Sequence, residues 1–420
     1  MKEIIIKRIC LTDWKAKNLD VTFNEGVTKI SAKNEVGKSS LQQAWNWLFT
    51  SYTTPTSGRN ANLYDNRVPL SPDTPQASVK VWLTIDGTEY TLERIAQAKF
   101  KRARGEEEWV KDASDTYITK IDDFEVTATA FAEWVEEMIC PMDMMPFVLD
   151  GAFFTTLSIQ DKKKARAVIE SIVGGCDIDA LKGDYSKLAS KLAKHTPEQI
   201  RAQVMALMSP IKKRMDAIPS IIKNKQFVVN DLLKRYNAER LHDKVMELTE
   251  CAVKSPDKET LSALISASME LGVAKYAEVE KAGIDSLAKE NKELARTLAE
   301  MEGEKALIEA LMEEMAAIVG DKVNAILKGC QVSMFSTQVN GTCVPDCVVT
   351  DMEGVSFATL SNSARLRVNL AIQDMFREHY GITTMTWIDE AAVYDDDHLP
   401  VPMGQVCYLF AGNSDTLEVE

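Results

Sequence analysis

The chain has 420 residues, of which 45% are hydrophobic and 27% charged, as is ordinary for a soluble globular protein with two or three domains. Asp and Glu total 63 against 49 Lys and Arg, and the resulting net charge of -14 argues against a protein that coats DNA by bulk charge, although a local basic groove stays possible. The sequence has no apolar run of the ~18 residues that a membrane helix needs, and its eight cysteines are scattered, so we expect a cytoplasmic protein without a membrane segment.

The first 130 residues are rich in signals for β-strands, namely short runs of β-branched residues separated by turns. Asp86-Gly87 is a strong two-residue turn signal and predicts a hairpin. Thr127 is a good cap for the start of a helix, and Gly174-Gly175 is a typical end of one. We expect strands at 4–9, 19–23, 27–32, 78–85 and 88–96, and helices at 128–139 and 160–173.

The middle of the chain, from about 178 to 325, has a helical pattern with a turn-like break at 254–259. Apolar residues repeat every seven positions in its second half, with Asn291 and Lys305 as polar members of the companion positions, which predicts a coiled coil. The repeating residues are Leu287, Leu294, Met301, Ile308 and Met315. Pro197, Pro210 and Pro219 predict kinks in the first half. An ordinary helical bundle is the alternative.

Strand signals return after residue 330, around a helix expected at 363–379 and strands expected at 383–389 and 405–411. Strand-rich ends around a helical hairpin imply that the two ends join in space. We therefore expect an α/β head built from an N-terminal lobe (1–177) and a C-terminal lobe (326–420), with an antiparallel coiled-coil hairpin (178–325) inserted between them.

The segment VTKISAKNEVGKSSLQQAW resembles a phosphate-binding loop between a strand and a helix. Lys38 would reach the β- and γ-phosphates, and Ser39 would bind Mg²⁺. Ala32 stands where the first glycine of the motif belongs, and a positive φ there would cost a residue with a Cβ about 1 kcal/mol. The expected nucleotide-binding residues are Asn34, Glu35, Val36, Gly37, Lys38, Ser39 and Ser40.

Two further motifs that resemble parts of ATP-binding sites lie in the C-terminal part of the chain. TTMTWIDE is an apolar strand that ends in Asp389 and Glu390, as in a Walker B element, where the Asp holds Mg²⁺ and the Glu polarises the attacking water. TLSNSARLRVNLAIQDMF resembles the signature motif LSGGExxRxxLA of ABC-type ATPases, with Ser361 at the start of a helix. A plain serine cap on an amphipathic helix and a strand ending in two surface acids are the alternatives.

In the order of these motifs around a coiled coil, the chain resembles the SMC-like, ABC-type ATPases of DNA repair and recombination, such as the ATPase subunit of the SbcCD-type nuclease. Within that group it resembles the short phage-encoded members. The resemblance implies an ATPase that uses ATP and Mg²⁺, with Glu390 and Lys38 as catalytic residues and Mg²⁺ at Ser39, Asp389 and Asp150. It also implies a homodimer in which Ser361, Asn362 and Ser363 of one copy contact the nucleotide of the other. Hydrolysis should be slow, because Asn413 and Ser414 replace the family's switch histidine.

The resemblance further implies double-stranded DNA and a nuclease subunit as partners, in a bacterial or phage-infected cell. The basic run KFKRAR offers Lys99, Lys101, Arg102 and Arg104 for phosphate contacts, with a solvated face as the alternative. Thr12, Asp13 and Lys15 lie where the family packs the adenine and ribose, and Arg59 is a further candidate neighbour of the nucleotide. A second interpretation is an ATPase switch or scaffold, for example in defence, that is regulated by a protein rather than by DNA.

Overall fold

The computed structural model describes residues 1–420 except 66, 68, 103–107, 113, 177–179, 338–342 and 392–399. The chain forms two compact units, one made of residues 1–180 and 315–420 and the other of residues 181–314. We call them the head unit and the arm unit. Among the described residues, none of the helices combines the length and the apolar character that crossing a membrane requires.

The head unit contains a seven-stranded, mainly antiparallel sheet in the order β12-β1-β4-β5-β8-β9, with β2 paired to β1. The hairpin predicted at Asp86-Gly87 is confirmed, because both residues have positive φ (49° and 82°) between β4 and β5, as a tight hairpin turn needs. The strands are β1 (Lys2–Trp14), β2 (Lys17–Thr22), β4 (Ala77–Ile85), β5 (Thr88–Gln97), β8 (Thr116–Ile121), β9 (Phe124–Val126) and β12 (Ile382–Thr383).

A second sheet has the order β13-β14-β3-β15 and joins the two ends of the chain, as the sequence predicted. Its C-terminal strands β13 (Thr386–Ile388) and β14 (Val406–Ala411) run parallel to the N-terminal strand β3 (Val27–Ala32). The single strand expected at 383–389 is wrong: its first part pairs with β1 as β12 and its second part pairs with β14. The short strand β15 (Glu418–Val419), which we did not predict, pairs with the other edge of β3.

Helices of the head unit pack on these sheets around a core rich in tryptophan and phenylalanine, including the fully buried Trp14, Trp45, Trp47 and Phe49. Thr127 caps the second helix by accepting from the Ala130 N–H, as predicted. The helices are α1 (Lys38–Thr50), α2 (Ala128–Met138), α3 (Met145–Leu149), α4 (Ala152–Gln160), α5 (Lys162–Val173) and α10 (Asn362–Tyr380), beside a separate hairpin of β10 (Gln331–Thr337) and β11 (Cys343–Thr350).

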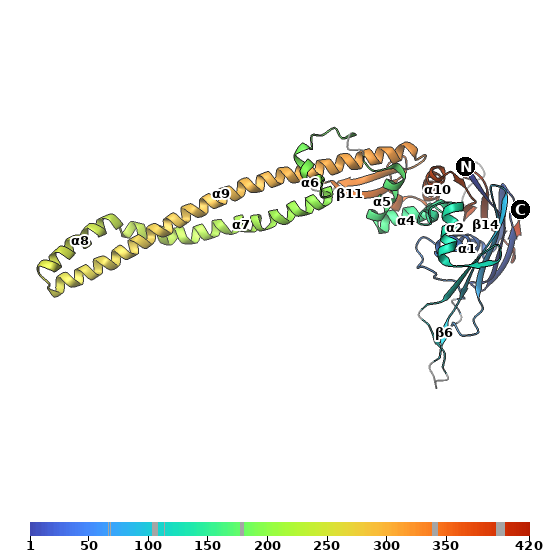
Figure 1. Cartoon of the computed structure of the whole chain (residues 1–420), viewed down its shortest axis with the longest axis horizontal. Helices are drawn as coiled ribbons and strands as arrows, with labels where there is room; N and C mark the ends of the chain where they lie inside the picture. The colour runs from blue at the N-terminus through green and yellow to red at the C-terminus, as the bar shows by residue number, and fades with distance from the viewer. Residues whose placement is uncertain are drawn as a thin grey trace. The chain divides into compact units, whose positions relative to one another are not determined.

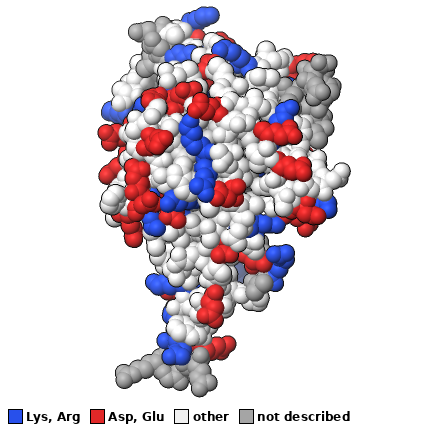
Figure 2. Space-filling view, turned by 90° about the vertical axis from the view of Figure 1, so that its right-hand side faces the viewer, with Lys and Arg blue, Asp and Glu red and all other residues white. Residues whose placement is uncertain are grey.

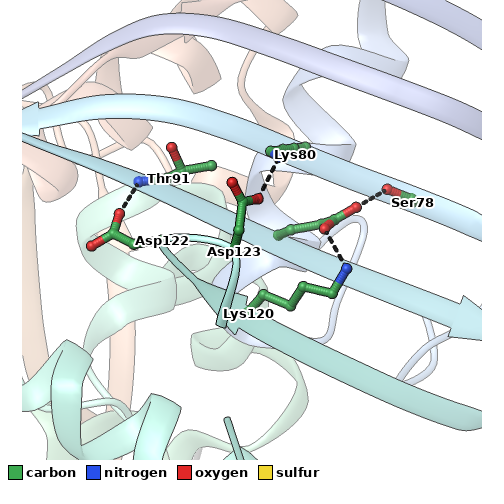
Figure 3. A network of polar contacts seen from close by, with 7 residues as sticks. Ser78, Lys80, Thr91, Lys120, Asp122 and Asp123 are labelled. Carbon is green, nitrogen blue, oxygen red and sulfur yellow. Dashed lines mark hydrogen bonds and ion pairs between the residues drawn. The ribbon is translucent and has the colours of Figure 1, made fainter. Parts of the chain in front are cut away.

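One face of the large sheet carries cross-strand polar contacts (Figure 3). Glu93 on β5 accepts from Ser78 on β4 and from Lys120 on β8, at 3.0 Å in each case. Lys80 contacts Asp123 of the β8–β9 turn at 2.5 Å. Such exposed pairs across neighbouring strands are screened by solvent, so each one stabilises the sheet only slightly.

A buried arginine supports the helix that follows the phosphate-binding loop. Arg94 on β5 donates to the Trp47 carbonyl at 2.8 Å and to Ser51 Oγ at 2.7 Å, so its charge lies at the C-terminal end of α1. Its guanidinium also stacks over the Trp47 ring at 4.6 Å. Burial lowers the pKa of Arg94 to about 10, which leaves it charged at neutral pH, where it complements the helix dipole.

We predict that Arg94→Met lowers the free energy of unfolding by about 2–4 kcal/mol, because the carbonyl and hydroxyl groups at the end of α1 lose a charged, buried donor. Urea unfolding followed by tryptophan fluorescence measures this. Arg8→Met is the control, since Arg8 forms an exposed ion pair with Asp20 that solvent screens, so its loss should have little effect on stability. Equal effects of the two substitutions would contradict the role of Arg94.

The arm unit consists of helices (Figure 1). Pro197 starts α7 rather than interrupting it, with Thr196 forming a capping box, and Pro210 and Pro219 lie inside this one helix. Pro210 and Pro219 therefore do not divide α7 into separate helices. The first arm of the hairpin is divided instead at Tyr236 and Asn237, between α7 and α8. The helices are α6 (Ala189–Leu192), α7 (Pro197–Arg235), α8 (Ala238–Lys254) and α9 (Lys258–Ile326), which continues into the head unit.

The predicted heptad positions lie on the partly or fully buried side of α9. Ion pairs link α9 to α7 along their length, among them Arg214 with Glu290 at 2.7 Å and Arg201 with Glu309 at 2.8 Å. The two helices are thus an antiparallel pair, which confirms the coiled-coil hairpin over the helical-bundle alternative. Asn291 lies in this seam with its buried Oδ1 unpaired, a polar position of the kind that fixes register.

Candidate nucleotide-binding site

The phosphate-binding loop lies between β3, which ends at Ala32, and α1, which begins at Lys38. Gly37 has φ of 124°, and a Cβ there would lie 2.9 Å from Leu19 Cδ1, so the position requires glycine. Ala32 is a buried residue of the strand, paired with Ala411, and has no positive φ. The strain expected at Ala32 is therefore absent, and the loop turns at Glu35 (φ 68°) and Gly37 instead.

The ammonium group of Lys38 lies within the loop. Its Nζ donates to the carbonyl oxygens of Ala32 and Lys33 at 2.5 Å and 2.8 Å, and its side chain is buried. A buried cation beside the first N–H groups of a helix is an electrostatic arrangement that favours an anion such as a phosphate.

Two of the three predicted Mg²⁺ ligands, Ser39 and Asp389, meet at the edge of the second sheet. Asp389 follows β13, and its Oδ2 accepts from Ser39 Oγ of α1 at 2.6 Å. Because β13, β14 and β3 are parallel, their carboxyl ends share one edge, which brings residues 350 positions apart into contact. Hydroxyl and carboxylate oxygens are ligands that Mg²⁺ prefers. The neighbouring Glu390 has φ of 54° and is exposed.

A cleft of about 620 Å³ opens over this loop, a size typical of small-molecule sites. It contains every predicted loop residue except Val36, together with Asp389 and Glu390, and of the three candidates for the adenine and ribose it contains only Lys15. Arg59 does not line it. Its lining comprises Lys15, Lys17, Asn34, Glu35, Gly37, Lys38, Ser39, Ser40, Gln43, Asn62, Tyr64, Asp65, Arg67, Asp389, Glu390, Leu409 and Ala411.

Several polar residues of this cleft were not foreseen. Lys17 donates to the Glu35 carbonyl. Arg67 donates to Asp65 at 2.8 Å, and this hydrogen bond lowers the pKa of the Asp65 carboxyl group. Lys17 belongs to β2, and Asp65 and Arg67 belong to the loop after α1, so no sequence motif links them to the phosphate-binding loop. Lys15, which the sequence did suggest, donates to Gln43 of α1, and burial lowers its pKa.

A second cleft of about 210 Å³ joins Asp389 and Glu390 to Asp150 and to the start of α10, where Asn362 and Ser363 lie. The Asp150 carboxylate accepts from the Ala152 N–H at 2.8 Å and from Gln42 Nε2 at 3.3 Å. Burial raises the pKa of Asp150, against the opposing effect of the Ala152 N–H. Asp150 thus belongs to the second cleft and is absent from the lining of the first.

The helix with the signature-like motif is fixed to this cleft by buried contacts. Ser361 caps α10 by accepting from the Ala364 N–H at 3.4 Å. Arg377 on the same helix donates to the Val148 carbonyl at 3.0 Å and to Thr386 Oγ1 of β13 at 2.6 Å. A Cβ on Gly151 would lie 1.9 Å from the Asn369 carbonyl oxygen, so the segment before α4 packs directly on the backbone of α10.

The basic run predicted to contact DNA lies on a two-stranded ribbon of β6 (Phe100–Lys101) and β7 (Val110–Lys111). Lys99 and Lys101 lie 3.9 Å and 3.8 Å from Asp112, and the Arg102 guanidinium stacks over Trp109 at 5.2 Å. Arg104 lies outside the described residues. On the face shown in Figure 2, acidic and basic side chains are interspersed, so that face has no extended basic field.

Comparison with known proteins gives one family. The family model for an AAA domain matches residues 10–318, which is more than half of the chain and includes the phosphate-binding loop. No curated protein matches.

The solved structures that resemble the chain at low identity include the following three. One is the Smc head domain with an extended coiled coil, bound to the C-terminal domain of ScpA, from Pyrococcus furiosus (11% identity, 99% of this chain and 96% of that chain, TM-score 0.40). The others are the recombination mediator protein RecF with ATP (16%, 99% and 94%, 0.35) and with ATPrS (16%, 98% and 94%, 0.34). Similarity at this level does not establish a shared function.

Proposed function

Because this chain belongs to the AAA domain family, we propose that it binds and hydrolyses ATP at the cleft over the phosphate-binding loop. The contact between Ser39 Oγ and Asp389 Oδ2 at 2.6 Å carries the proposal, because it pairs two oxygen ligands beside the buried Lys38. A phosphate-binding loop between a strand and a helix, with two acidic residues at the same sheet edge, provides the groups that phosphoryl transfer requires.

Each residue then has a defined task. Lys38 exchanges the carbonyls of Ala32 and Lys33 for phosphate oxygens, and the N–H groups at the start of α1 bind the same anion. Ser39 and Asp389 would hold Mg²⁺, which when bound would neutralise charge on the phosphates. Glu390 accepts a proton from, and orients, the water that attacks the γ-phosphorus.

The proposal includes a homodimer of head units joined by ATP. The start of α10, with Ser361, Asn362 and Ser363, would contact the nucleotide of the other copy. Support comes from the sequence resemblance and from the place of the start of α10, where Asn362 and Ser363 line the second cleft together with Asp389 and Glu390. The positive end of a helix dipole favours an anion there. If ATP binds the paired heads more tightly than the separate heads, its binding would shift the dimer from the open to the closed state.

We propose double-stranded DNA as the substrate on which this switch acts, with a separate nuclease subunit supplying any cleavage, in DNA repair, recombination or phage DNA processing. Exposed cations and an aromatic side chain on the β6–β7 ribbon support this part, together with the resemblance in sequence. Such groups make phosphate contacts that are independent of sequence and sensitive to salt.

Changing Lys99, Lys101, Arg102 and Arg104 together to Ser should lower duplex affinity at least tenfold in dilute salt. The magnitude of the slope of log affinity against log salt concentration should fall by about 3 to 4, because each phosphate contact that is removed lowers the number of released counterions by about 0.9. Fluorescence anisotropy over a salt series measures both quantities.

The matched control removes four exposed lysines of the arm unit, namely Lys234, Lys244, Lys281 and Lys289, by the same change to Ser. If both quadruple variants weaken binding equally, the ribbon has no special role and only net charge matters.

The net charge of -14 and the mixed charges of the face in Figure 2 favour a second candidate, an ATPase switch or scaffold controlled by a protein partner. ATP hydrolysis measured with and without duplex DNA separates the two. Stimulation by DNA supports the DNA-linked function, whereas a rate that ignores DNA favours the protein-regulated switch.

A further inference from the structure

The side chain of Lys17, at the start of β2, lies across the phosphate-binding loop. A Cβ added at Gly37 would lie 3.7 Å from both Cγ and Cδ of Lys17, so the stem of the lysine packs over that glycine. Its ammonium group donates to the carbonyl oxygen of Glu35, two residues earlier in the loop. Because α1 begins directly after Gly37, these contacts place the Lys17 cation beside the helix start at which an anion is favoured.

The charge of Lys17 has no acidic partner of its own. Within the described part of the chain, its partly exposed ammonium group forms no ion pair and donates to a neutral carbonyl oxygen. Asp65 lies close enough to sense this charge. However, the hydrogen bond from Arg67 is the main cause that lowers the pKa of Asp65, and the charge of Lys17 only adds to it. A cation held by a neutral oxygen gains free energy when it exchanges that oxygen for a charged one.

Lys38 is held in the same way as Lys17. The Lys38 ammonium group donates to the carbonyl oxygens of Ala32 and Lys33, which belong to the same loop as Glu35. Two lysines from different elements, one from α1 and one from β2, therefore occupy carbonyl groups of one loop. A polyphosphate bound at this loop could replace these carbonyl oxygens at both ammonium groups.

The charges that line the first cleft are balanced only when Lys17 is counted. The lining contains four basic and four acidic residues, namely Lys15, Lys17, Lys38 and Arg67 against Glu35, Asp65, Asp389 and Glu390. Without Lys17 the lining would have an excess of negative charge, which repels the negative charges of a polyphosphate. The cleft therefore needs this lysine more than a surface with surplus cations would.

Lys15 is less suited to this task, although it is the lysine of the β1–β2 turn that the sequence resemblance suggested. Its ammonium group donates to the side chain of Gln43 on α1, and burial lowers its pKa. Burial disfavours the charged form of a lysine. Lys17 lies against the loop itself and is partly exposed, so it keeps its charge where the phosphates would bind.

We propose that Lys17 is a second phosphate-binding residue, which leaves the Glu35 carbonyl and binds the β- and γ-phosphates of ATP together with Lys38. This inference rests on the proposed ATP site and adds to it a residue that the phosphate-binding motif does not contain. The lysine of that motif binds the β- and γ-phosphates, and the stem of Lys17 lies over the residue directly before it. AMP, which has only the α-phosphate, would not reach Lys17.

The test is Lys17→Met, studied by equilibrium titration with ATP, AMP and inorganic tripolyphosphate in the presence of Mg²⁺. Affinity for ATP should fall by roughly 10- to 100-fold, as expected when a hydrogen bond between charged groups is lost. Tripolyphosphate should lose the same factor, because the contact involves no part of the base or ribose. Affinity for AMP should stay unchanged. Lys17→Arg, which keeps the charge, should restore most of the affinity for ATP.

Lys7→Met is the matched control. Lys7 is a partly exposed lysine of the neighbouring strand β1, where it pairs with Glu25 and does not line the first cleft. Its loss should leave the affinity for ATP unchanged. Thermal unfolding without nucleotide should give the same midpoint for Lys17→Met as for wild type, because the contact with Glu35 is exposed and its loss should affect stability little.

Three outcomes would overturn the inference. Equal losses of affinity for ATP and AMP would show that Lys17 only supports the shape of the loop. ATP binding that depends on Lys38 but not on Lys17 would refute this inference alone and leave the proposed function intact. A wild-type chain that does not bind ATP would refute both.

Discussion

Replacing Lys38 by Met should lower the affinity for ATP about 100-fold or more, which corresponds to roughly 2.7 kcal/mol. The Lys38 ammonium group is buried and held by two loop carbonyls, so it is already placed at the entrance to α1 before a phosphate arrives. Met keeps much of the volume of the side chain and removes the charge. Isothermal titration with ATP measures the loss directly.

Lys33→Met is the matched control for this variant. Lys33 belongs to the same loop, but its side chain points to solvent and pairs with Asp415 at 2.9 Å. Its loss should change ATP affinity by less than twofold. Thermal unfolding of both variants shows whether the head unit stays folded. If the two lysines prove equally important or equally dispensable, the assignment of Lys38 is wrong.

Replacing Glu390 by Gln should slow hydrolysis at least 100-fold while leaving ATP binding intact, because a general base in phosphoryl transfer is worth about 10²–10⁴ in rate. Glu390 directly follows the Mg²⁺ candidate Asp389 in the sequence. It lines both clefts, and the first of these also contains the phosphate-binding loop. Gln preserves size and polarity and cannot accept the proton.

Two measurements are needed for this variant. Phosphate release reports hydrolysis, and nucleotide titration reports binding. Glu353→Gln, an exposed acid on the turn after β11, controls for the loss of a negative charge and should behave as wild type. We also expect the Glu390→Gln chain to accumulate as an ATP-bound dimer in size-exclusion chromatography, since hydrolysis would otherwise separate the heads. A variant that hydrolyses ATP at the wild-type rate would exclude Glu390 as the base.

Much of the head could be predicted from local patterns. The phosphate-binding loop follows from a β-branched strand, Gly37 and Lys38, and the hairpin at 86–87 follows from residues that tolerate positive φ. The strand-rich ends around a helical hairpin predicted that the two ends join in space, and the pairing of β3 with β14 confirms it. The resemblance to P-loop ATPases is confirmed at the level of the AAA domain family.

Other features depend on contacts that no local pattern encodes. The run at 383–389 has the composition of one strand, but hydrogen bonds to β1 and to β14 divide it between two sheets. Tyr64, Asp65 and Arg67 reach the first cleft only because the loop after α1 folds back over it. Pro210 and Pro219 lie inside the single helix α7, although each proline removes a backbone N–H that a helix interior would use.

The most direct test of the central claim is steady-state phosphate release from ATP by the wild-type chain, with Mg²⁺ and then with EDTA, beside Lys38→Met and Glu390→Gln prepared in the same way. We predict slow release that requires Mg²⁺ and falls at least 100-fold in both variants. Release that is the same in all three proteins, or that persists in EDTA, would show that the cleft over the phosphate-binding loop is not an ATPase site.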